Sequence, residues 1–471
     1  MDNPKHPEKA KISQEPDLQP DAIAGNMDVY HKVPKGYRIL GLFTLPAYRA
    51  PITQCVIIAI VHLAVVGMFN VLSALGGGGQ IDPTTSNNAN TILYSLFCAF
   101  ALVSGSVCNF LGPKITLATG GIGYSLLSAS YWSYNNNMNQ AFVYFGGATC
   151  GVAAAFLWTA EGSMIMSLPL EKDKGKYVGI FYGVSFFGTV VGAIIPTVEN
   201  WGSQRPEAVV ACFVSDPSKV IRNDGSRVMI PRQTSFVQEL KNVWVVVKRE
   251  PWIILFFPYS FAGLWYIPYQ SNDFNAYFFD LRTRAFGSLW FDFGQFVTAV
   301  ILGLLLDYTK LGGRRQRAFI GWLFLFVLIN AVFVGGVFPA RESHRGRPPA
   351  HLLDVHDSRA AGYIALYTFY GAVDGAWQTF AWWIMGALSN DPLVLSIYSA
   401  FYKVFGAMGA AIVFSLDVHE VSYQAMFGSY WGLLAGSMVI LMVLIYKRVQ
   451  DTLILPVIDS TKKEESIING I

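Results

Sequence analysis

Residues 318–338 read AFIGWLFLFVLINAVFVGGVF, an apolar run that contains no charged side chain. A helix needs about 20 such residues to cross about 30 Å of hydrocarbon, because each residue adds about 1.5 Å. Runs of this kind recur along the chain and predict a membrane protein with many helices. The predicted spans are Ile52–Leu75, Thr91–Phe110, Ile115–Trp132, Ala141–Ala160, Tyr177–Ile195, Pro251–Gln270, Ser288–Leu306, Ala318–Phe338, Ala360–Leu388, Leu393–Leu416 and Ala425–Tyr446.

The composition agrees with this interpretation. Of the 471 residues, 53% are hydrophobic and 14% are charged, whereas about a quarter of a soluble domain is charged. The net charge of +3 is too small to indicate nucleic-acid binding. The five cysteines are isolated, without the spacing of a metal site or a disulfide framework, so we expect no metal and no cofactor. Walker, nucleophile-elbow and HExxH motifs are absent from the sequence, and nothing in it indicates an enzyme.

The predicted spans divide the chain into two transmembrane halves. Residues 48–198 hold five spans and residues 251–446 hold six. The polar loop between them, residues 199–250, predicts a hairpin around an Asn-Asp-Gly turn at 223–225 and an amphipathic helix near 236–247. Residues 1–47 and 447–471 are expected to be tails on the cytosolic side, the first of them disordered.

Lysine and arginine in short loops predict the orientation, because such loops stay in the cytosol. Basic residues follow the fourth span (Lys172), the seventh (Arg315) and the last (Lys447), whereas the loop Tyr134–Gln140 carries no charge. Each half is consistent with this rule by itself. Five spans from a cytosolic N-terminus nevertheless leave the basic central loop outside, so one crossing is missing. Its only apolar candidate, Ala208–Val214, reaches about a third of the bilayer. A natural protein with an odd number of spans is the alternative.

The seventh span ends in Gly303-Leu-Leu-Leu-Asp307, followed by Arg314 and Arg315. This pattern resembles a loop signature of the major facilitator superfamily, Gly-x-x-x-Asp followed by basic residues. The glycine lets helices approach, and the aspartate meets a helix N-terminus or an arginine. The corresponding loop of the first half, residues 111–114, lacks most of the signature.

Three further stretches resemble the Unc-ninety-three-like family, a branch of the major facilitator superfamily that is common in fungi. They are Leu157–Gly162 (LWTAEG), Asp374–Phe380 (DGAWQTF) and Trp383–Asn390 (WIMGALSN), and Phe401-Tyr402-Lys403 accompanies them. The resemblance covers roughly residues 48–446. It implies an all-α bundle of two six-helix halves, in which the sixth helix, the one missing from the eleven spans, is peripheral.

Ionisable residues inside spans are the candidate site, because burying one unpaired costs at least about 2.5 kcal/mol. Asp374 lies in the middle of its span, and the same helix face carries Tyr370, Trp377 and Gln378. Lys403 of the next span lies at a similar height, so an ion pair with Asp374 is predicted; a fixed structural pair and a lysine reaching toward the interface are the alternatives. Glu161 is either a proton or substrate carboxylate or a solvated helix end. His62 is a weaker candidate for facing the cavity.

Two functions fit these residues. One is a secondary transporter that alternates access to a midplane site for a small molecule or ion. The other is a non-transporting regulatory subunit or trafficking chaperone of another membrane protein, which the resemblance implies because animal relatives are linked to channel regulation and receptor escort. The charges within the spans favour transport, and the degraded signature of the first half favours the second function. The sequence leaves open whether the plasma membrane or an internal membrane holds the protein.

Overall fold

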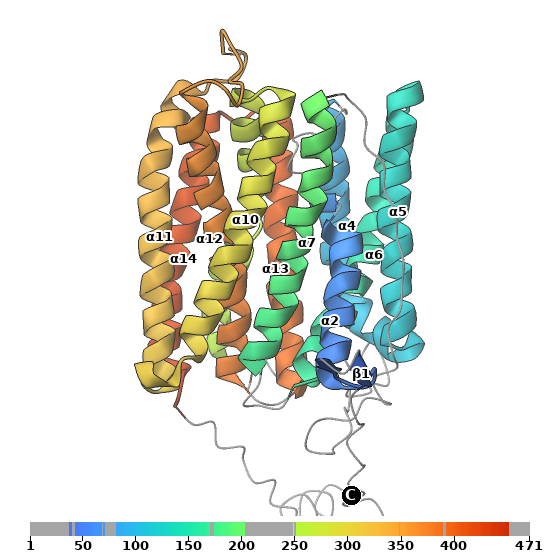
Figure 1. Ribbon diagram of the computed structural model, residues 1–471, viewed down its shortest axis with the longest axis vertical. Coiled ribbons are helices and arrows are strands. Elements are labelled where there is room, and N and C mark those ends of the chain that lie inside the picture. Colours follow the sequence, from blue (N-terminus) through green and yellow to red (C-terminus); the bar gives the residue numbers. More distant parts are fainter. Residues whose placement is uncertain are drawn as a thin grey trace, which may run out of the picture.

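The computed structural model is a bundle of long helices that stand side by side (Figure 1). It describes residues 37–39, 43–67, 69–70, 82–169, 174–202, 248, 251–347, 349–389 and 392–451. Within these ranges, seven helices are long and apolar enough to cross a membrane, and two apolar helical segments are shorter. The predicted all-α membrane fold is confirmed, whereas the count of eleven spans stays a prediction.

The first half begins with a small antiparallel hairpin, in which Tyr37 pairs with Leu45. Its elements are β1 (Tyr37–Ile39), β2 (Phe43–Leu45), α2 (Pro51–His62), the π-helical turn η1 (Leu63–Gly67), α4 (Pro83–Leu111), α5 (Pro113–Asn137), α6 (Gln140–Ser167) and α7 (Lys174–Gly202).

The second half starts at Pro251. Its elements are the 3₁₀ segment η4 (Pro251–Phe256), α9 (Phe257–Ala262), the π-helical η5 (Tyr269–Ala276), α10 (Leu281–Asp307), η6 (Thr309–Leu311), α11 (Arg314–Glu342), α12 (Ala360–Leu388), α13 (Pro392–Val418) and α14 (Tyr423–Arg448). Each predicted span overlaps one or more of these helices. The predicted hairpin, the amphipathic helix and Ala208–Val214 lie outside the described residues.

Several helices are longer than the predicted spans, and four of them, α4, α6, α10 and α14, begin at a side-chain cap. The Asp82 side chain accepts a hydrogen bond from the Thr85 backbone N–H at 3.0 Å and opens α4. Asp280 caps α10 in the same way through the N–H of Thr283, at 2.9 Å. Such caps satisfy N–H groups that the helix leaves unpaired, so the helix extends beyond its apolar run.

Glycine pairs bring neighbouring helices into close contact at matching places in the two halves. In the first half, Gly147 and Gly151 of α6 lie against backbone carbonyls of α4. In the second half, Gly371 and Gly375 of α12 lie against backbone carbonyls of α10. A Cβ at any of these four positions would collide with the facing carbonyl, so the spacing Gly-x-x-x-Gly fixes the same helix pair, second with fourth, in each half.

The two halves meet along two seams. At one seam α4 packs against α13, and at the other α7 packs against α10. The outer helices α5 and α6 lie at one side of the bundle and α11 and α14 at the other, with α7, α10 and α13 between them (Figure 1). Residues that face the seams therefore lie at the centre of the molecule.

Candidate functional site

A buried hydrogen-bonded pair joins α2 to α6. The His62 Nδ1 lies 2.9 Å from the Glu161 Oε2, and both side chains are almost fully buried. The His62 ring meets Trp158 edge-on, with centroids 4.6 Å apart. The second carboxylate oxygen of Glu161 has no hydrogen-bond partner. Of the two interpretations of Glu161, the solvated helix end is wrong, because only 1% of the residue is exposed.

Lys403 points from α13 toward the first half. Its Nζ lies 3.6 Å from the centroid of the Trp158 ring and 5.8 Å from that of Trp382. The predicted direct ion pair with Asp374 is not formed, although Lys403 interacts electrostatically with both Glu161 and Asp374. Counting residues gave Lys403 the right height, but it gave no information about the direction in which the side chain leaves its helix.

Asp374 is held by amides. Its Oδ2 accepts hydrogen bonds from Gln295 Nε2 of α10, at 2.5 Å, and from Gln378 Nε2, at 3.0 Å. Its Oδ1 has no partner. The predicted polar face of α12 does not act as one unit. Trp377 of this face stacks on Tyr259, with ring centroids 3.8 Å apart.

Tyr370, also predicted on this face, belongs to an aromatic cluster instead. Its ring meets Tyr269 and Phe333 edge-on. The structure thus brings Asp374 and Gln378 into direct contact and gives Trp377 and Tyr370 packing contacts.

The site is closed. Residues of both halves, Trp158, Glu161 and Phe181 from the first and Trp382 from the second, enclose a cavity of about 10 Å³, about the least that one water molecule needs. The arrangement can hold charges of both signs away from water and present tryptophan faces to a guest. Among the described residues, no three His, Cys, Asp or Glu side chains gather as a metal site would need.

The contacts of the loop signature agree with the prediction for Asp307, which interacts with an arginine, and differ from it for Gly303. Asp307 accepts a hydrogen bond from Trp383 Nε1 at 3.4 Å and interacts electrostatically with Arg317. The backbone N–H of Arg315 donates to Asp451, and its guanidinium lies over the Tyr446 ring. Gly303 has no neighbour within 4 Å of the place a Cβ would take, so the predicted close approach of helices is not seen there. Arg314 opens α11. This basic end of the bundle is called the Arg315 end.

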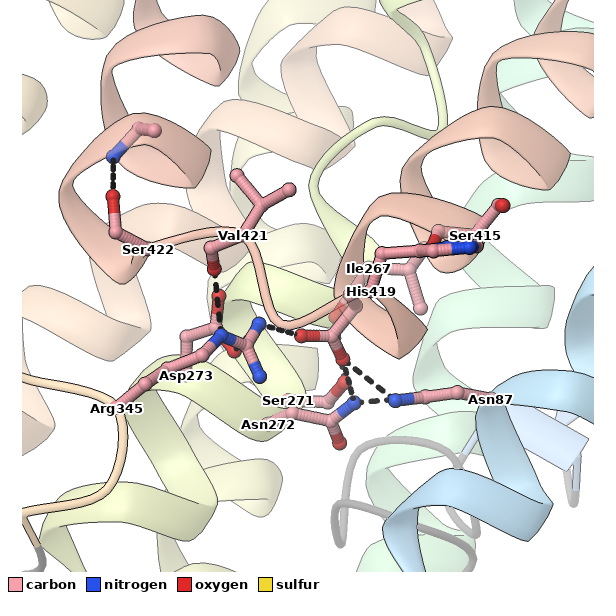
Figure 2. Close-up of polar contacts among 12 residues, drawn as sticks. Asn87, Ile267, Ser271, Asn272, Asp273, Arg345, Ser415, His419, Val421 and Ser422 are labelled. Atoms are coloured by element: carbon pink, nitrogen blue, oxygen red, sulfur yellow. Dashed lines mark hydrogen bonds and ion pairs between the residues drawn. The ribbon is translucent and has the colours of Figure 1, made fainter.

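A polar cluster at the opposite end joins the two halves. It consists of Asn87 of α4, Asn272 and Asp273 of η5, Asp417 of α13 and Arg345 of the loop after α11, and is called the Arg345 cluster. Figure 2 shows Asn87 and Asn272 close together, with Arg345 reaching in from its loop. Asn87 Nδ2 donates to Asp417 Oδ2 at 2.6 Å, and Asn272 Nδ2 donates to the same oxygen at 2.9 Å.

Sequence reasoning missed this cluster. Asn87 precedes its predicted span, and Asp273 and Asp417 follow theirs, where polar residues are ordinary. Arg345 lies in a long loop whose position no periodicity predicts. The sequence signal was weak: Asp417 directly follows its predicted span, and Asp273 follows its own after Ser271 and Asn272.

Comparison with known proteins finds relatives over most of the chain. The family model described as "Ion channel regulatory protein UNC-93" matches residues 77–212. An UNC93-like protein of Schizosaccharomyces pombe is 36% identical over 432 residues, which are 88% of this chain and 86% of that protein. UNC93-like protein 1 of Arabidopsis thaliana is 32% identical over 424 residues, covering 86% and 92% of the two chains.

Solved structures resemble the whole bundle. The fucose:proton symporter of Escherichia coli superposes with a TM-score of 0.52 at 11% identity, over 85% of this chain and 98% of that one. A bacterial homologue of the iron transporter ferroportin, in its outward-facing state, gives 0.51 at 10% identity, over 84% and 99%. These likenesses establish the major facilitator fold.

Proposed function

Because the chain belongs to the UNC93-like family and has the major facilitator fold, we propose that it is a secondary transporter with alternating access. Its site lies between the halves, around Lys403, Glu161 with His62, and Asp374. The observation that carries the proposal is Lys403 of the second half over Trp158 of the first, 3.6 Å from the ring centroid. When the two halves move relative to each other, the charge of Lys403 must leave Trp158, so its environment changes with the transport cycle.

The chemistry of the site favours a small polar solute or ion. Two carboxylates and one ammonium share a space that excludes water, so a charged guest can replace one of the internal partners. Trp158 and Trp382 offer flat faces to an organic guest or a cation. The His62–Glu161 pair also supplies a proton acceptor, as proton-coupled uptake requires.

Uptake into liposomes tests the proposal. The purified protein would be screened with radiolabelled sugars, amino acids, nucleobases and ferrous iron, with and without an inward proton gradient. We expect one class to accumulate, and Lys403→Gln to abolish that uptake. Lys447→Gln is the matched control, because Lys447 is exposed at the end of α14. Uptake that Lys403→Gln leaves unchanged would reject this site.

A second function is supported by the description of the matching family model, which names ion-channel regulation. In that case the chain binds another membrane protein and moves no solute. Purification in mild detergent distinguishes the two, because a regulatory subunit would copurify with one stoichiometric channel or receptor and would show no uptake with any solute of the panel.

The positive-inside rule supports an orientation with the Arg315 end in the cytosol. Arg315 and Lys447 lie together at this end, since the ring of Tyr446 contacts both side chains. The Arg345 cluster would then face the outside or an organelle lumen, and the C-terminus would be cytosolic.

A further inference from the structure

The Arg345 cluster contains one more negative charge than it can balance. Arg345 forms ion pairs with Asp417 and, at 3.5 Å, with Asp273. Two carboxylates and one guanidinium leave a net charge of −1 if every group is ionised. Asp273 is 1% exposed and Asp417 is 3% exposed. An uncompensated charge so deeply buried is costly, and neutralising it with a proton is the usual remedy.

The two carboxylates are not equally satisfied. Asp417 accepts from Asn87 and Asn272 and pairs with Arg345. Neither oxygen of Asp273 has a hydrogen-bond partner, yet the same Arg345 Nη2 pairs with oxygens of both Asp273 and Asp417, so the two carboxyl groups are close neighbours. A proton on Asp273 would supply the missing donor and remove the surplus charge in one step, as in other close carboxylate pairs.

The other ionisable groups around Asp273 do not supply the missing proton. Tyr423 of α14 and Tyr269 of its own helix also face it. Burial alone would lower the pKa of Arg345, but Asp273 and Asp417 outweigh this and the pKa is raised, so the guanidinium stays charged. Two histidines lie beside the cluster: His344, next to Arg345, has its Nδ1 3.0 Å from Gln424 Nε2, and His419 has its Nδ1 2.7 Å from the Ser415 carbonyl.

The same carboxylates hold the seam between the halves. Asn87 is the member of the cluster from the first half, and it donates directly to Asp417 of the second. Two turns deeper, Tyr94 of α4 stacks on Phe414 of α13, with centroids 5.7 Å apart. Asn90, on the same side of α4 between these contacts, is buried. Opening the seam at this end must therefore break the bond between Asn87 and Asp417.

We propose that Asp273 holds a proton and donates it in a hydrogen bond to Asp417, and that this proton keeps the two halves latched at the Arg345 end. When the proton leaves, two adjacent buried anions repel each other and gain by hydration, so the latch opens. In the latched state this proton stays at the Arg345 end and has no path to the other end. The two aspartates therefore control the opening of the seam and do not carry a transported proton. This inference rests on the proposed alternating access.

Cysteine labelling tests the latch without any transport measurement. The five native cysteines would be replaced, and Asn90→Cys would be labelled with a membrane-impermeant maleimide from the Arg345 end between pH 5.5 and 8.5. Asn136→Cys, at the exposed end of α5, corrects for the faster reaction of thiols at high pH. We expect the ratio of the two labelling rates to rise with pH, by up to about tenfold per unit for one proton.

Variants connect this rise to the proposed proton. Asp273→Asn removes the surplus negative charge and keeps the Arg345 cluster neutral, so the ratio should stay low at every pH. Asn87→Ala removes the bond across the seam, so the ratio should stay high. Asp354→Asn is the matched control, because the backbone N–H of His356 holds the pKa of Asp354 below its usual value and the group does not titrate in this range.

Four results would overturn the proposal. They are a ratio independent of pH in the parent, an unchanged pH dependence in Asp273→Asn, a pH dependence that His344→Gln abolishes, and a ratio that responds to replacing sodium with choline at constant pH. The last would show that a metal cation, not a proton, occupies the pair. The labelling experiment does not measure transport. If the protein shows no uptake but the labelling ratio still rises with pH, the transporter proposal fails and the latch proposal stands.

Discussion

At the scale of single residues, the pair formed by His62 and Glu161 should be visible in stability. His62→Ala leaves a carboxylate that is 1% exposed without its partner, and breaking a buried pair from one side costs about 3–5 kcal/mol. We expect the variant to lose its monodisperse gel-filtration peak at a lower temperature than the parent.

Neutralising the partner as well should recover much of this loss. The double variant His62→Ala/Glu161→Gln no longer buries an unpaired charge, so its melting temperature should lie between those of the parent and His62→Ala. Equal damage in the single and double variants would show that His62 contributes packing and not charge compensation.

Lys403 and Trp158 offer a second test at this scale. The ammonium lies over the ring, 3.6 Å from its centroid, and both residues are half-buried, so the contact should contribute about 1–2 kcal/mol. In a double-mutant cycle with Lys403→Met and Trp158→Leu, measured by thermal unfolding in detergent, we expect a coupling of that size. Purely additive effects would contradict the contact.

For these residues, the sequence predicted which side chains belong to the candidate site better than it predicted which of them contact one another. Asp374 was predicted to have a polar helix face, and Gln378 does contact it. Its other partner, Gln295, lies 79 positions away on α10, and no periodicity predicts which face of α10 meets α12. Glu161 was one of the candidates, but its contact with His62 depends on the packing of α2 against α6. Contacts between residues of one helix can be predicted from their spacing. Contacts between two helices also depend on how each helix is rotated about its axis, which the spacing does not give.

At the scale of helices, the glycines of α12 set how closely it approaches α10. A methyl group at Gly371 would collide with the carbonyl of Phe291, and such overpacking costs about 1–3 kcal/mol or more. We expect Gly371→Ala to lower the yield of monodisperse protein and its melting temperature. Gly362→Ala on the same helix is the matched control, since nothing lies within 4 Å of the added atom. Equal behaviour of the two variants would contradict close packing at Gly371.

Glycine spacing alone did not indicate which pairs matter. The Gly179-x-x-x-Gly183 pattern of α7 looks the same in sequence, yet a Cβ at Gly179 would meet nothing within 4 Å and one at Gly183 only Val300, at 3.9 Å. Gly188 of the same helix does face Leu63 closely. A glycine matters for packing only if another helix lies against it, and not if it faces lipid. The spacing of the glycines does not predict which of these applies.

The orientation of the helices can be tested at the Arg315 end. With the native cysteines replaced, Arg315→Cys should react with an impermeant maleimide only after the cells are permeabilised. Asn136→Cys, at the other end of the bundle, should react in intact cells if the protein is in the plasma membrane, and only in released and opened organelles otherwise. Labelling of Arg315→Cys in intact cells would reverse the proposed orientation.

At the scale of the whole molecule, the two halves differ in their peripheral helices. In the second half, α14 packs against both α11 and α9. Among the described residues of the first half, α5 and α2 both contact α6, and no helix corresponding to α14 is described. The predicted missing crossing falls between α7 and Pro251, a stretch of which only Lys248 is described.

Inserting a span is the corresponding experiment. About 20 apolar residues spliced near Ser203–Pro206 supply one more crossing and keep the basic central loop in the cytosol. We expect a higher yield of monodisperse protein and greater resistance to protease than in the chain as it stands. Equal yield and resistance of both proteins would mean that the chain folds well with its present number of crossings.

The first helix of each half contains a π-helical turn, η1 directly after His62 and η5 around Asp273. A π turn carries one residue more than an α turn, so rewinding it to α geometry would shift the register by one residue. At 3.6 residues per turn, that shift rotates everything beyond it by about 100°. His62 directly precedes one of these turns, and Asn272 and Asp273 of the Arg345 cluster lie in the other. Rewinding either turn would therefore reorient these side chains relative to the rest of the bundle, while the α4–α6 and α10–α12 pairs stay in place.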